Sequence, residues 1–403
     1  MYRKAYKLIW RIRVYLSLLI RMTPAAKKER QKDRLGISEN DPGIEEAIDK
    51  GVAWLCQAQD NSASKDGGVA NYSLFSGWST SYPETTGYIV PTMLDYARLR
   101  KDDKTRQRAR EMLDWLVSIQ FPEGGFQCGL IGSKPAIPVT FNTGQILIGL
   151  ASGVHEFGDR YRAAMCHAAD WLVVTQDPDG CWRKHPSPLT GPGEKAYETH
   201  VAWGLLEAAR IEPGKGYAEA ALSNIQWALT QQNDNGWFRQ CCTTDPTRPL
   251  THALGYVLRG LLEAYRYNGD TGLLDGCRKT ADGCLVAMGK DGFLPGRLLP
   301  NWEGAVSSSC LTGSVQIAYC LLLLYQFTKE PRYREAAYAI NRYVRRTMEI
   351  KGSPETCGAI KGSFPVDGDY APYKYPNWAC KFFVDANILE KSVRESEENE
   401  NNS

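Results

Sequence analysis

The sequence lacks the short patterns that would assign its chemistry at once. No two of its twelve cysteines have the Cys-x-x-Cys spacing of a structural zinc site, and only five of its 403 residues are histidine. The apolar run within the first twenty residues is too short and too interrupted by charge to span a bilayer. Twelve cysteines in so long a chain do not form a disulfide scaffold either. We therefore expect a soluble protein of a reducing compartment, the cytoplasm, with no metal or other cofactor.

An excess of positive over negative charge is confined to the first segment of the chain. Residues 1–35 hold eleven Lys or Arg against Glu29 and Asp33, although the whole chain has a formal net charge of only +2. The rest of the chain is therefore net negative, and we expect no nucleic-acid partner. Arg11 and Arg13 interrupt the apolar residues of the first segment. Two interpretations stay open: a basic amphipathic segment on an anionic membrane surface at the inner membrane face, or a tail without fixed structure.

The remaining sequence repeats one helical pattern. A threonine, replaced by Asn in the last copy, recurs at intervals of 52 to 65 residues and is followed by an apolar run of helical length. An amphipathic segment precedes each copy, for example residues 43–59 and 217–232, where apolar residues recur every three or four positions. This self-similarity predicts helical hairpins over residues 40–392, followed by a disordered acidic tail at 393–403. The repeated positions are Thr86, Thr143, Thr199, Thr251, Thr312 and Asn377.

A second repeat stands between the two helices of a pair. It reads Gln-x-x-x-Gly-x-Trp/Phe at Gln120–Phe126 and Gln176–Trp182, and a shortened copy spans Gln232–Trp237. Together with the alternating helices, this motif resembles the α/α-toroid superfamily, which includes terpenoid cyclases, protein prenyltransferase β-subunits, polysaccharide lyases and glycosidases. The resemblance implies an all-α fold, a toroid (barrel) of six helical hairpins with an inner and an outer ring of helices. It does not imply one chemistry, because a fold hosts many functions.

In such a toroid the inner helices begin at one open end of a central cavity, so polar residues near the repeated threonine are candidate catalytic groups. His200 and His252 occupy matching positions of consecutive hairpins, and Glu84 and Glu198 stand just before the threonine of theirs. Histidine and carboxylate side chains can act as general acid or base, and the neighbouring Tyr197 can also transfer a proton. The structural alternative is that hydroxyls cap the helix starts and acids are favoured there by the helix dipole.

Aromatic, amide and charged side chains near the same helix starts, in the repeats and in the loops before the last two inner helices, are candidate substrate-binding residues. Aromatic platforms beside carboxylates and amides suit sugar rings, which present an apolar face and polar edges. The structural alternative is that these aromatic residues pack the loops. The candidates are Tyr82, Asn142, Trp237, Arg297, Trp302, Glu303, Asp367, Tyr370 and Trp378.

These residues favour a carbohydrate-active enzyme among the members of the superfamily. Class II terpenoid cyclases carry Asp-x-Asp-Asp, and the nearest match here, Asp367–Tyr370, lacks the paired terminal carboxylates. We find no convincing set of the zinc ligands that prenyltransferases use. We therefore predict a lyase, epimerase or glycoside hydrolase whose substrate is an anionic or uronate-containing oligo- or polysaccharide of the cell envelope or exopolysaccharide. The alternatives are a terpenoid cyclase- or prenyltransferase-like enzyme with an isoprenoid substrate, and a toroid that only binds.

Overall fold

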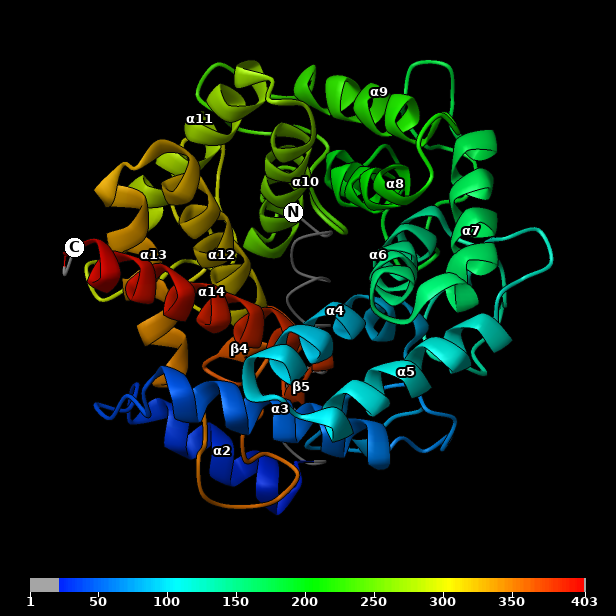
Figure 1. Cartoon of the computed structure of the whole chain (residues 1–403). Helices are drawn as coiled ribbons and strands as arrows, with labels where there is room; N and C mark the ends of the chain where they lie inside the picture. Colours follow the sequence, from blue (N-terminus) through cyan, green and yellow to red (C-terminus); the bar gives the residue numbers. More distant parts are fainter. Residues whose placement is uncertain (1–21, 402–403) are drawn as a thin grey trace, which may run out of the picture.

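The helices form two concentric rings in the computed structural model, which describes residues 22–401 (Figure 1). Successive helices alternate between the outer and the inner ring, and each inner helix packs against the next, with α14 against α4 closing the ring. The predicted all-α toroid is thereby confirmed. The inner helices are α4 (Pro83–Arg100), α6 (Thr140–Phe157), α8 (Thr199–Ile211), α10 (Thr251–Asn268), α12 (Leu311–Thr328) and α14 (Asn377–Asn401). The outer helices are α3 (Ile44–Asp60), α5 (Asp103–Ser118), α7 (Arg162–Thr175), α9 (Tyr217–Leu229), α11 (Thr271–Ala287) and α13 (Pro331–Arg345), and α2 (Pro24–Arg34) precedes both rings.

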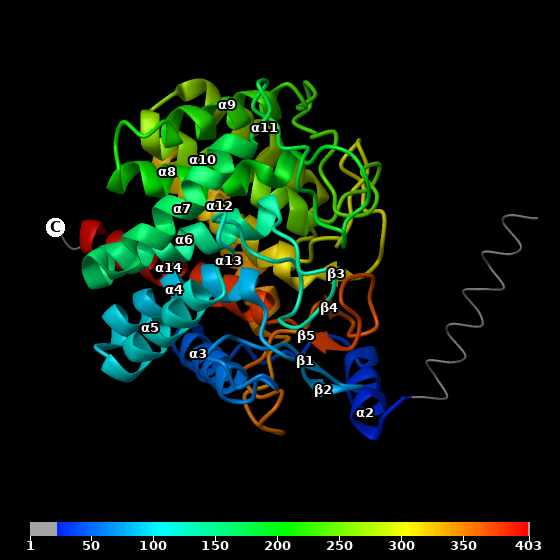
Figure 2. The ribbon, with the colours of Figure 1, turned by 90° about the vertical axis from the view of Figure 1, so that its right-hand side faces the viewer.

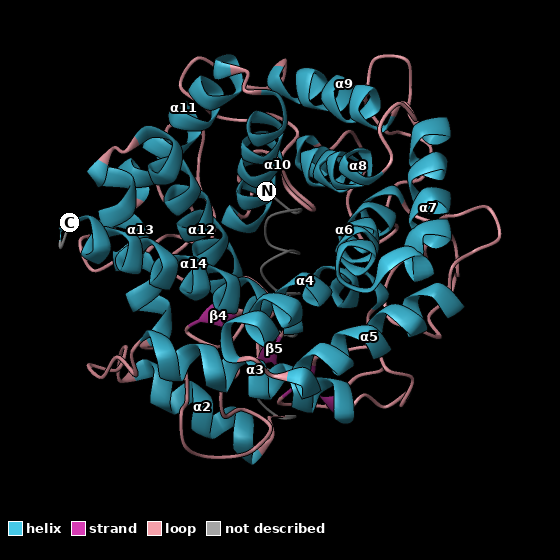
Figure 3. Ribbon diagram, in the orientation of Figure 1, coloured by secondary structure: helices cyan, strands magenta, loops and turns pink. Residues whose placement is uncertain are grey.

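Short strands gather at one end of the toroid, beside the loops that lead into the inner helices (Figure 2). Figure 3 shows how little of the fold is strand. β1 pairs antiparallel with both β2 and β5, and β3 pairs with β4. The β1–β5 pair joins the loop of the first hairpin to the loop before α14, so it helps to close the ring. The strands are β1 (Tyr72–Ser73), β2 (Gly77–Trp78), β3 (Ser309–Cys310), β4 (Ser363–Phe364) and β5 (Lys374–Tyr375).

The inner helices are enclosed on nearly every side, and α12 shows the consequence most clearly. It is long and apolar enough to cross a membrane by length and composition, yet most of it is buried within the described part of the chain. It packs against α10, α13 and α14. An apolar surface all round is what a helix needs when other helices cover it.

The Gln-x-x-x-Gly turns fasten each outer helix to the next. The Nε2 of Gln120 donates to the carbonyl of Gly124 in its own turn (2.9 Å) and to that of Ala164 on α7 (3.0 Å). Gln176 makes the same two bonds one repeat later, at 3.0 and 2.9 Å. Gly124 has a φ of +105°, and a Cβ there would lie 2.2 Å from the carbonyl oxygen of His167. Only glycine permits this close contact, so the motif serves the architecture.

The repeated threonine anchors a loop and does not cap its helix. The Oγ1 of Thr86 donates to the carbonyl of Tyr82 (2.8 Å) and accepts from the backbone N–H of Val69 (2.9 Å). Thr143 makes the equivalent bonds at 2.9 and 3.0 Å. The interpretation of these hydroxyls as caps is therefore wrong at both positions. Each one holds the incoming loop against the first turn of the inner helix.

The acidic C-terminal segment is helical, which corrects the prediction of a disordered tail at 393–403. Helix α14 continues to Asn401, and its Glu397 accepts a hydrogen bond from the hydroxyl of Tyr325 (2.7 Å) and pairs with Arg334. These partners lie on α12 and α13, so the tail has a surface to pack against. The composition of the segment did not reveal this surface.

Helix α2 attaches the N-terminal part of the chain to the loop before α14. The buried Nζ of Lys361 donates to Glu29 (2.8 Å), and Arg30 pairs with Asp367 at 2.9 Å. The described part of the predicted basic segment is therefore bound to the toroid. Residues 1–21 of that segment lie outside the described residues.

Candidate active site at the start of the inner helices

A pocket of about 250 Å³ opens where the inner helices begin. Tyr82 and Trp378, two predicted substrate-binding residues, line it with their ring centroids 5.8 Å apart. Its lining also includes the Asn71 amide, several serine hydroxyls and the exposed Lys374. Lys374 has no ion-pair partner among residues 22–401. The pocket thus combines aromatic planes, hydrogen-bonding groups and one available positive charge.

A continuous layer of rings leads from this pocket toward the axis of the toroid. The Nε1 of Trp378 donates to the hydroxyl of Tyr370 (2.8 Å), whose ring centroid lies 5.3 Å from that of His252. The ring of His252 in turn lies 4.5 Å from that of Tyr256. The structure thus brings the predicted Trp378, Tyr370 and His252 together near one helix-start region, although they come from α10 and from the last loop and helix.

Glu84 is a carboxyl group without a partner inside this layer. It is half-buried and makes no hydrogen bond or ion pair with any described residue. Burial raises its pKa to about 8. Burial, and to a smaller extent the charge of an ionised Glu84, raises the pKa of the phenols of Tyr82, Tyr256 and Tyr370. At neutral pH Glu84 is therefore protonated and can donate a proton.

His252 can accept a proton, which complements the proton donor Glu84. Its Nδ1 is 2.6 Å from the Oε1 of Gln316. An amide oxygen can only accept, so Nδ1 carries the proton and Nε2 keeps its lone pair. Burial lowers the pKa of His252 to about 4, although the bond to Gln316 opposes this shift. At neutral pH His252 is uncharged and can accept a proton.

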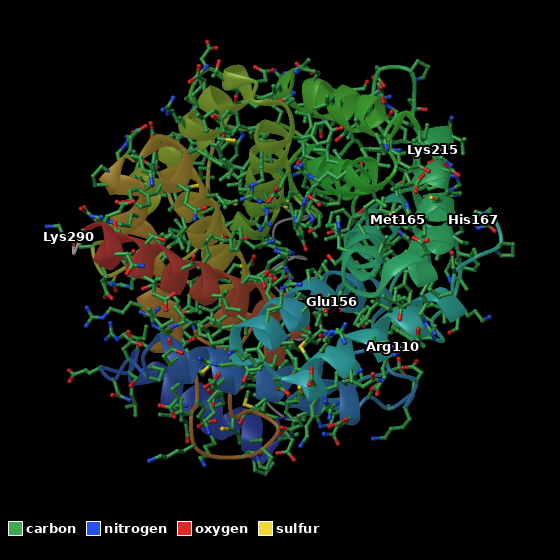
Figure 4. The ribbon with its side chains drawn as sticks, in the orientation of Figure 1. Arg110, Glu156, Met165, His167, Lys215 and Lys290 are labelled. Atoms are coloured by element: carbon green, nitrogen blue, oxygen red, sulfur yellow. The ribbon has the colours of Figure 1, made fainter. Side chains whose placement is uncertain are left out.

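His200 repeats this arrangement at a more enclosed position. Its Nδ1 lies 2.6 Å from the Oε1 of Gln145, and its Nε2 is buried without a partner. Its ring lies edge-on to Trp203 (5.0 Å), and burial, followed by the Arg259 charge, holds its pKa well below the usual value. By contrast, His167, another of the five histidines, lies on α7 at the outer edge of the molecule (Figure 4). Of the predicted pair, His252 is the one that lies nearer the pocket along the ring layer, because its ring packs on Tyr370, which accepts a hydrogen bond from the pocket-lining Trp378.

Buried polar atoms without partners are concentrated at the start of α6 and α8. Asn142 Nδ2 and Glu198 Oε2 have no hydrogen-bond partner in the described structure, and Thr140 Oγ1 and Gln145 Nε2 share this state. Burial raises the pKa of Glu198 to about 8. An unsatisfied buried polar group costs about 1–3 kcal/mol, so such a cluster indicates a place built for a polar ligand or water. The predicted Tyr197 is buried beside it.

Two predicted substrate-binding tryptophans belong to the packing of loops instead. The rings of Trp237 and Trp302 pack edge-on at 5.4 Å, and the Nε1 of Trp302 donates to the carbonyl of Asn235 (3.0 Å). Trp302 also lies against Gly283 of α11, on the outer ring. Their placement in the site is wrong, because a loop sequence does not fix the direction of its side chains.

Three charged residues that were predicted to bind substrate do not line the pocket. Arg297 is buried in an ion pair with Asp369, and Asp367 is paired with Arg30 of α2. Glu303 lies exposed in its loop. The two paired side chains fasten loops to one another, so they are not available to a substrate. The positive charge at the pocket comes from Lys374.

Three aromatic residues of the site were missed by sequence reasoning. Tyr256 contacts His252 and His200, and Phe382 contacts Tyr256 (6.0 Å) and Tyr88 (5.3 Å). Tyr256 follows His252 by four residues and so lies on the same face of its helix. That spacing could have identified Tyr256. No comparable signal marks Phe382 or Tyr88.

Solved structures share this fold along nearly their whole length. A crystal structure of an unsaturated glucuronyl hydrolase specific for heparin matches with a TM-score of 0.71 and 14% identity, over 88% of this chain and 99% of that one. A sugar epimerase from a ruminal bacterium matches with a TM-score of 0.69 and 14% identity, over 87% and 98%. At such identities the likeness shows the fold alone.

Sequence relatives are found on the terpenoid side of the superfamily. Drimenyl diphosphate synthase of Streptomyces showdoensis is 26% identical over 48% of this chain and 32% of its own length. The chain spans about a third or less of the length of the curated relatives that it matches. The family model of the squalene-hopene cyclase C-terminal domain matches residues 34–260, more than half of the chain. The protein therefore belongs to the squalene-hopene cyclase C-terminal domain family, a branch of the α/α-toroid superfamily that its repeats resemble.

Proposed function

We propose that this protein is a carbohydrate-active enzyme that moves a proton on an anionic sugar, as an epimerase or lyase with a uronate-containing glycan as substrate. One observation carries the proposal. Glu84 and His252 are both uncharged at neutral pH, one as a proton donor and one as a proton acceptor, and the ring of His252 packs on those of Tyr256 and Tyr370. Acid–base catalysis needs such a pair with pKa values pushed apart.

The chemistry follows from the charges of the site. Lys374 would pair with the carboxylate of the uronate, and Nε2 of His252 would take the proton from the carbon next to that carboxylate. The electron pair of the broken C–H bond moves into the carboxylate. Glu84 then gives its proton either to the same carbon from the other face, which inverts it, or to the departing oxygen of the next sugar, which cleaves the chain. Solvent returns the proton from His252 to Glu84 afterwards.

The two acids of the site favour proton transfer over hydrolysis. A glycoside hydrolase of the usual kind pairs a protonated carboxyl group with an ionised one. Here burial raises the pKa of both Glu84 and Glu198 to about 8, so neither is ionised at neutral pH. An uncharged histidine supplies the base that this pair lacks.

The solved structures support a sugar substrate. Their names describe proteins acting on glucuronyl units and on sugars, and this chain covers nearly the full length of each. The pocket agrees with this class of substrate, because Tyr82 and Trp378 offer ring faces beside serine hydroxyls and an amide.

A second candidate is the protonation of a carbon–carbon double bond in an isoprenoid. The observation that favours it is the layer of aromatic side chains at the start of the inner helices, which includes Tyr82, Tyr256 and Tyr370, together with the uncharged Glu84. The family match and the similarity to drimenyl diphosphate synthase agree with it. The absence of Asp-x-Asp-Asp counts against it.

Exchange of hydrogen for deuterium distinguishes the candidates. Uronate oligosaccharides incubated in D₂O with the wild type should gain deuterium or be cleaved to unsaturated products, as read by mass spectrometry. Glu84→Gln should lose this activity, whereas Glu303→Gln, at an exposed acid away from the pocket, should keep it. Consumption of a polyprenyl diphosphate in place of any sugar would establish the second candidate, and consumption of neither would leave a protein that only binds.

We also propose that the protein works in the cytoplasm at the inner face of the membrane, through the basic segment at residues 1–35. The support is its charge, since it holds eleven cations. Sedimentation with anionic liposomes should fall when residues 1–21 are deleted and when salt is raised. Equal sedimentation of the shortened protein would refute this location.

A further inference from the structure

A second cavity lies at the opposite end of the inner ring and has no part in the proposed reaction. Its volume is about 380 Å³, and each of the inner helices contributes at least one residue to its lining. Trp203, Arg259, Tyr319 and Lys381 are among these lining residues. The cavity combines buried cations with aromatic rings, in contrast to the uncharged groups of the first site.

Arg259 is held rigidly at the wall of this cavity. Its guanidinium carbon lies 4.1 Å from the ring centroid of Trp203 on α8 and 4.2 Å from that of Tyr319 on α12. Its Nε donates to Glu263 one turn later on the same helix (2.8 Å). The two terminal nitrogens make no hydrogen bond with the described residues. Two stacked rings thus fix a planar fork whose outer donors remain free.

Lys381 supplies a second cation with donors to spare. Its side chain is only 2% exposed, and its ammonium group bonds to Asp385 one turn later on α14. One bond leaves two of the three N–H groups of a lysine available. The positive charge of Arg259 helps burial to lower the pKa of Lys381, while Asp385 opposes them. Both cations line the same cavity, so an anion bound in it can be stabilised by two positive charges.

The carboxylates of the cavity are already occupied. Glu263 accepts from Arg259 and Arg266, and Asp385 accepts from Thr92 (2.6 Å) and Lys381. Glu207 accepts from the indole of Trp203, and Asp95 from Arg98. The cavity therefore has unused donors and few unused acceptors. Four carboxylates nevertheless outnumber the three cations of the lining, which disfavours an ion with several negative charges.

From this arrangement we propose that the cavity binds the carboxylate of a small molecule, held in a fork between Arg259 and Lys381. A carboxylate is planar and carries one negative charge, so it matches the free edge of a guanidinium group. The cavity is large enough for a monosaccharide-sized body behind that carboxylate. The proposal is independent of the proposed function, because none of these side chains lines the first pocket.

The test is a titration of the full-length protein with acetate, D-glucuronate and inorganic phosphate, followed by calorimetry and by thermal shift. Sodium chloride at equal ionic strength serves as the control for screening. Acetate and D-glucuronate should both bind saturably and raise the melting temperature, and stronger binding of D-glucuronate would identify a sugar acid. Saturable binding of phosphate alone, or of none of the three, would overturn the proposal.

Variants locate the binding. Arg259→Gln combined with Glu263→Gln removes the fork without leaving a buried charge, and it should weaken carboxylate binding about 10- to 100-fold, as expected for one or two charge-assisted hydrogen bonds. Arg266 lines the same cavity, but its side chain is 42% exposed. Carboxylate binding should therefore persist in Arg266→Gln. Lys374→Gln removes the positive charge of the first pocket, so carboxylate binding that persists in this variant belongs to the second cavity. Loss in Lys374→Gln with retention in the double variant would assign the carboxylate to the first pocket and refute the proposal.

Discussion

The two ends of the inner ring hold their ionisable groups in opposite states. Where the inner helices begin, Glu84, Glu198 and His252 are uncharged at neutral pH, and neither acid has an ion-pair partner among the described residues. In the second cavity, Arg259 and Lys381 are paired with carboxylates one turn away. Uncharged acids and bases can exchange protons with a ligand, whereas paired ions can only attract one.

Only a few side chains separate the first site from the second cavity. His200 and Gln316 lie beside a gap of about 10 Å³ that Arg259 also borders. The Arg259 charge contributes, after burial, to the low pKa of His200. The charged end therefore acts on the uncharged end through its field. We infer that one end performs the chemistry and that the other stabilises a charge.

The largest expected effect comes from the two histidines, which share one geometry but differ in depth. His252→Gln should lower kcat about 100- to 10,000-fold, because general base catalysis contributes that much. His200→Gln is the matched control, since His200 also binds a glutamine but has its Nε2 enclosed, and it should lower kcat only a few-fold. The measurement is steady-state turnover of whichever substrate the deuterium screen identifies. An equal fall in kcat in both variants would show that His252 has no catalytic role that His200 lacks.

The next largest effect is on stability, where Asp385 of the second cavity and Glu84 of the first site should differ. Asp385→Leu leaves Lys381 buried without its partner and should lower the free energy of unfolding by about 3–5 kcal/mol. Glu84→Gln removes no ion pair and should not lower it at neutral pH. Urea unfolding of both variants checks this contrast. A Lys381→Met change added to Asp385→Leu should restore most of the loss, and no restoration would mean that the pair is not the cause.

Sequence reasoning reached the architecture because the architecture repeats. Gln120 and Gln176 make the same two bonds at successive turns, so each copy supports the assignment of the others. The repeat also led to Glu84 and His252 as candidate residues, and their catalytic role stays a prediction. The site was missed where a loop sets the direction of a side chain, as at Trp302. Arg259 was passed over because a charge inside an amphipathic helix is indistinguishable, in sequence, from a solvated one.

The pH profile of kcat tests the uncharged end directly. His252 would be protonated below about pH 4 and Glu84 ionised above about pH 8, so kcat should be level between these values and fall on both sides. The fall above pH 8 should approach about tenfold per pH unit, as for the loss of one required proton. A profile that rises through pH 8 would show that the ionised form of Glu84 is the active one.

The smallest effect is a pH dependence of stability, and it tests the state of Glu84 without any substrate. In the folded protein Glu84 has a pKa of about 8, raised by burial from the ordinary 4.5. A raised pKa stabilises the fold fully below pH 4.5, and the benefit is lost as pH rises toward 8, because the unfolded chain releases a proton that the folded chain retains. Glu84→Gln has no such proton, so its stability relative to the wild type should increase between pH 4.5 and 8. The increase should be at most about 1.4 kcal/mol per pH unit, and it should level off above pH 8. Urea unfolding at several pH values measures it, with Glu303→Gln as the exposed control that should run parallel to the wild type. If the Glu84→Gln difference stays constant with pH, Glu84 is ionised in the fold, and its role as the proton donor fails with it.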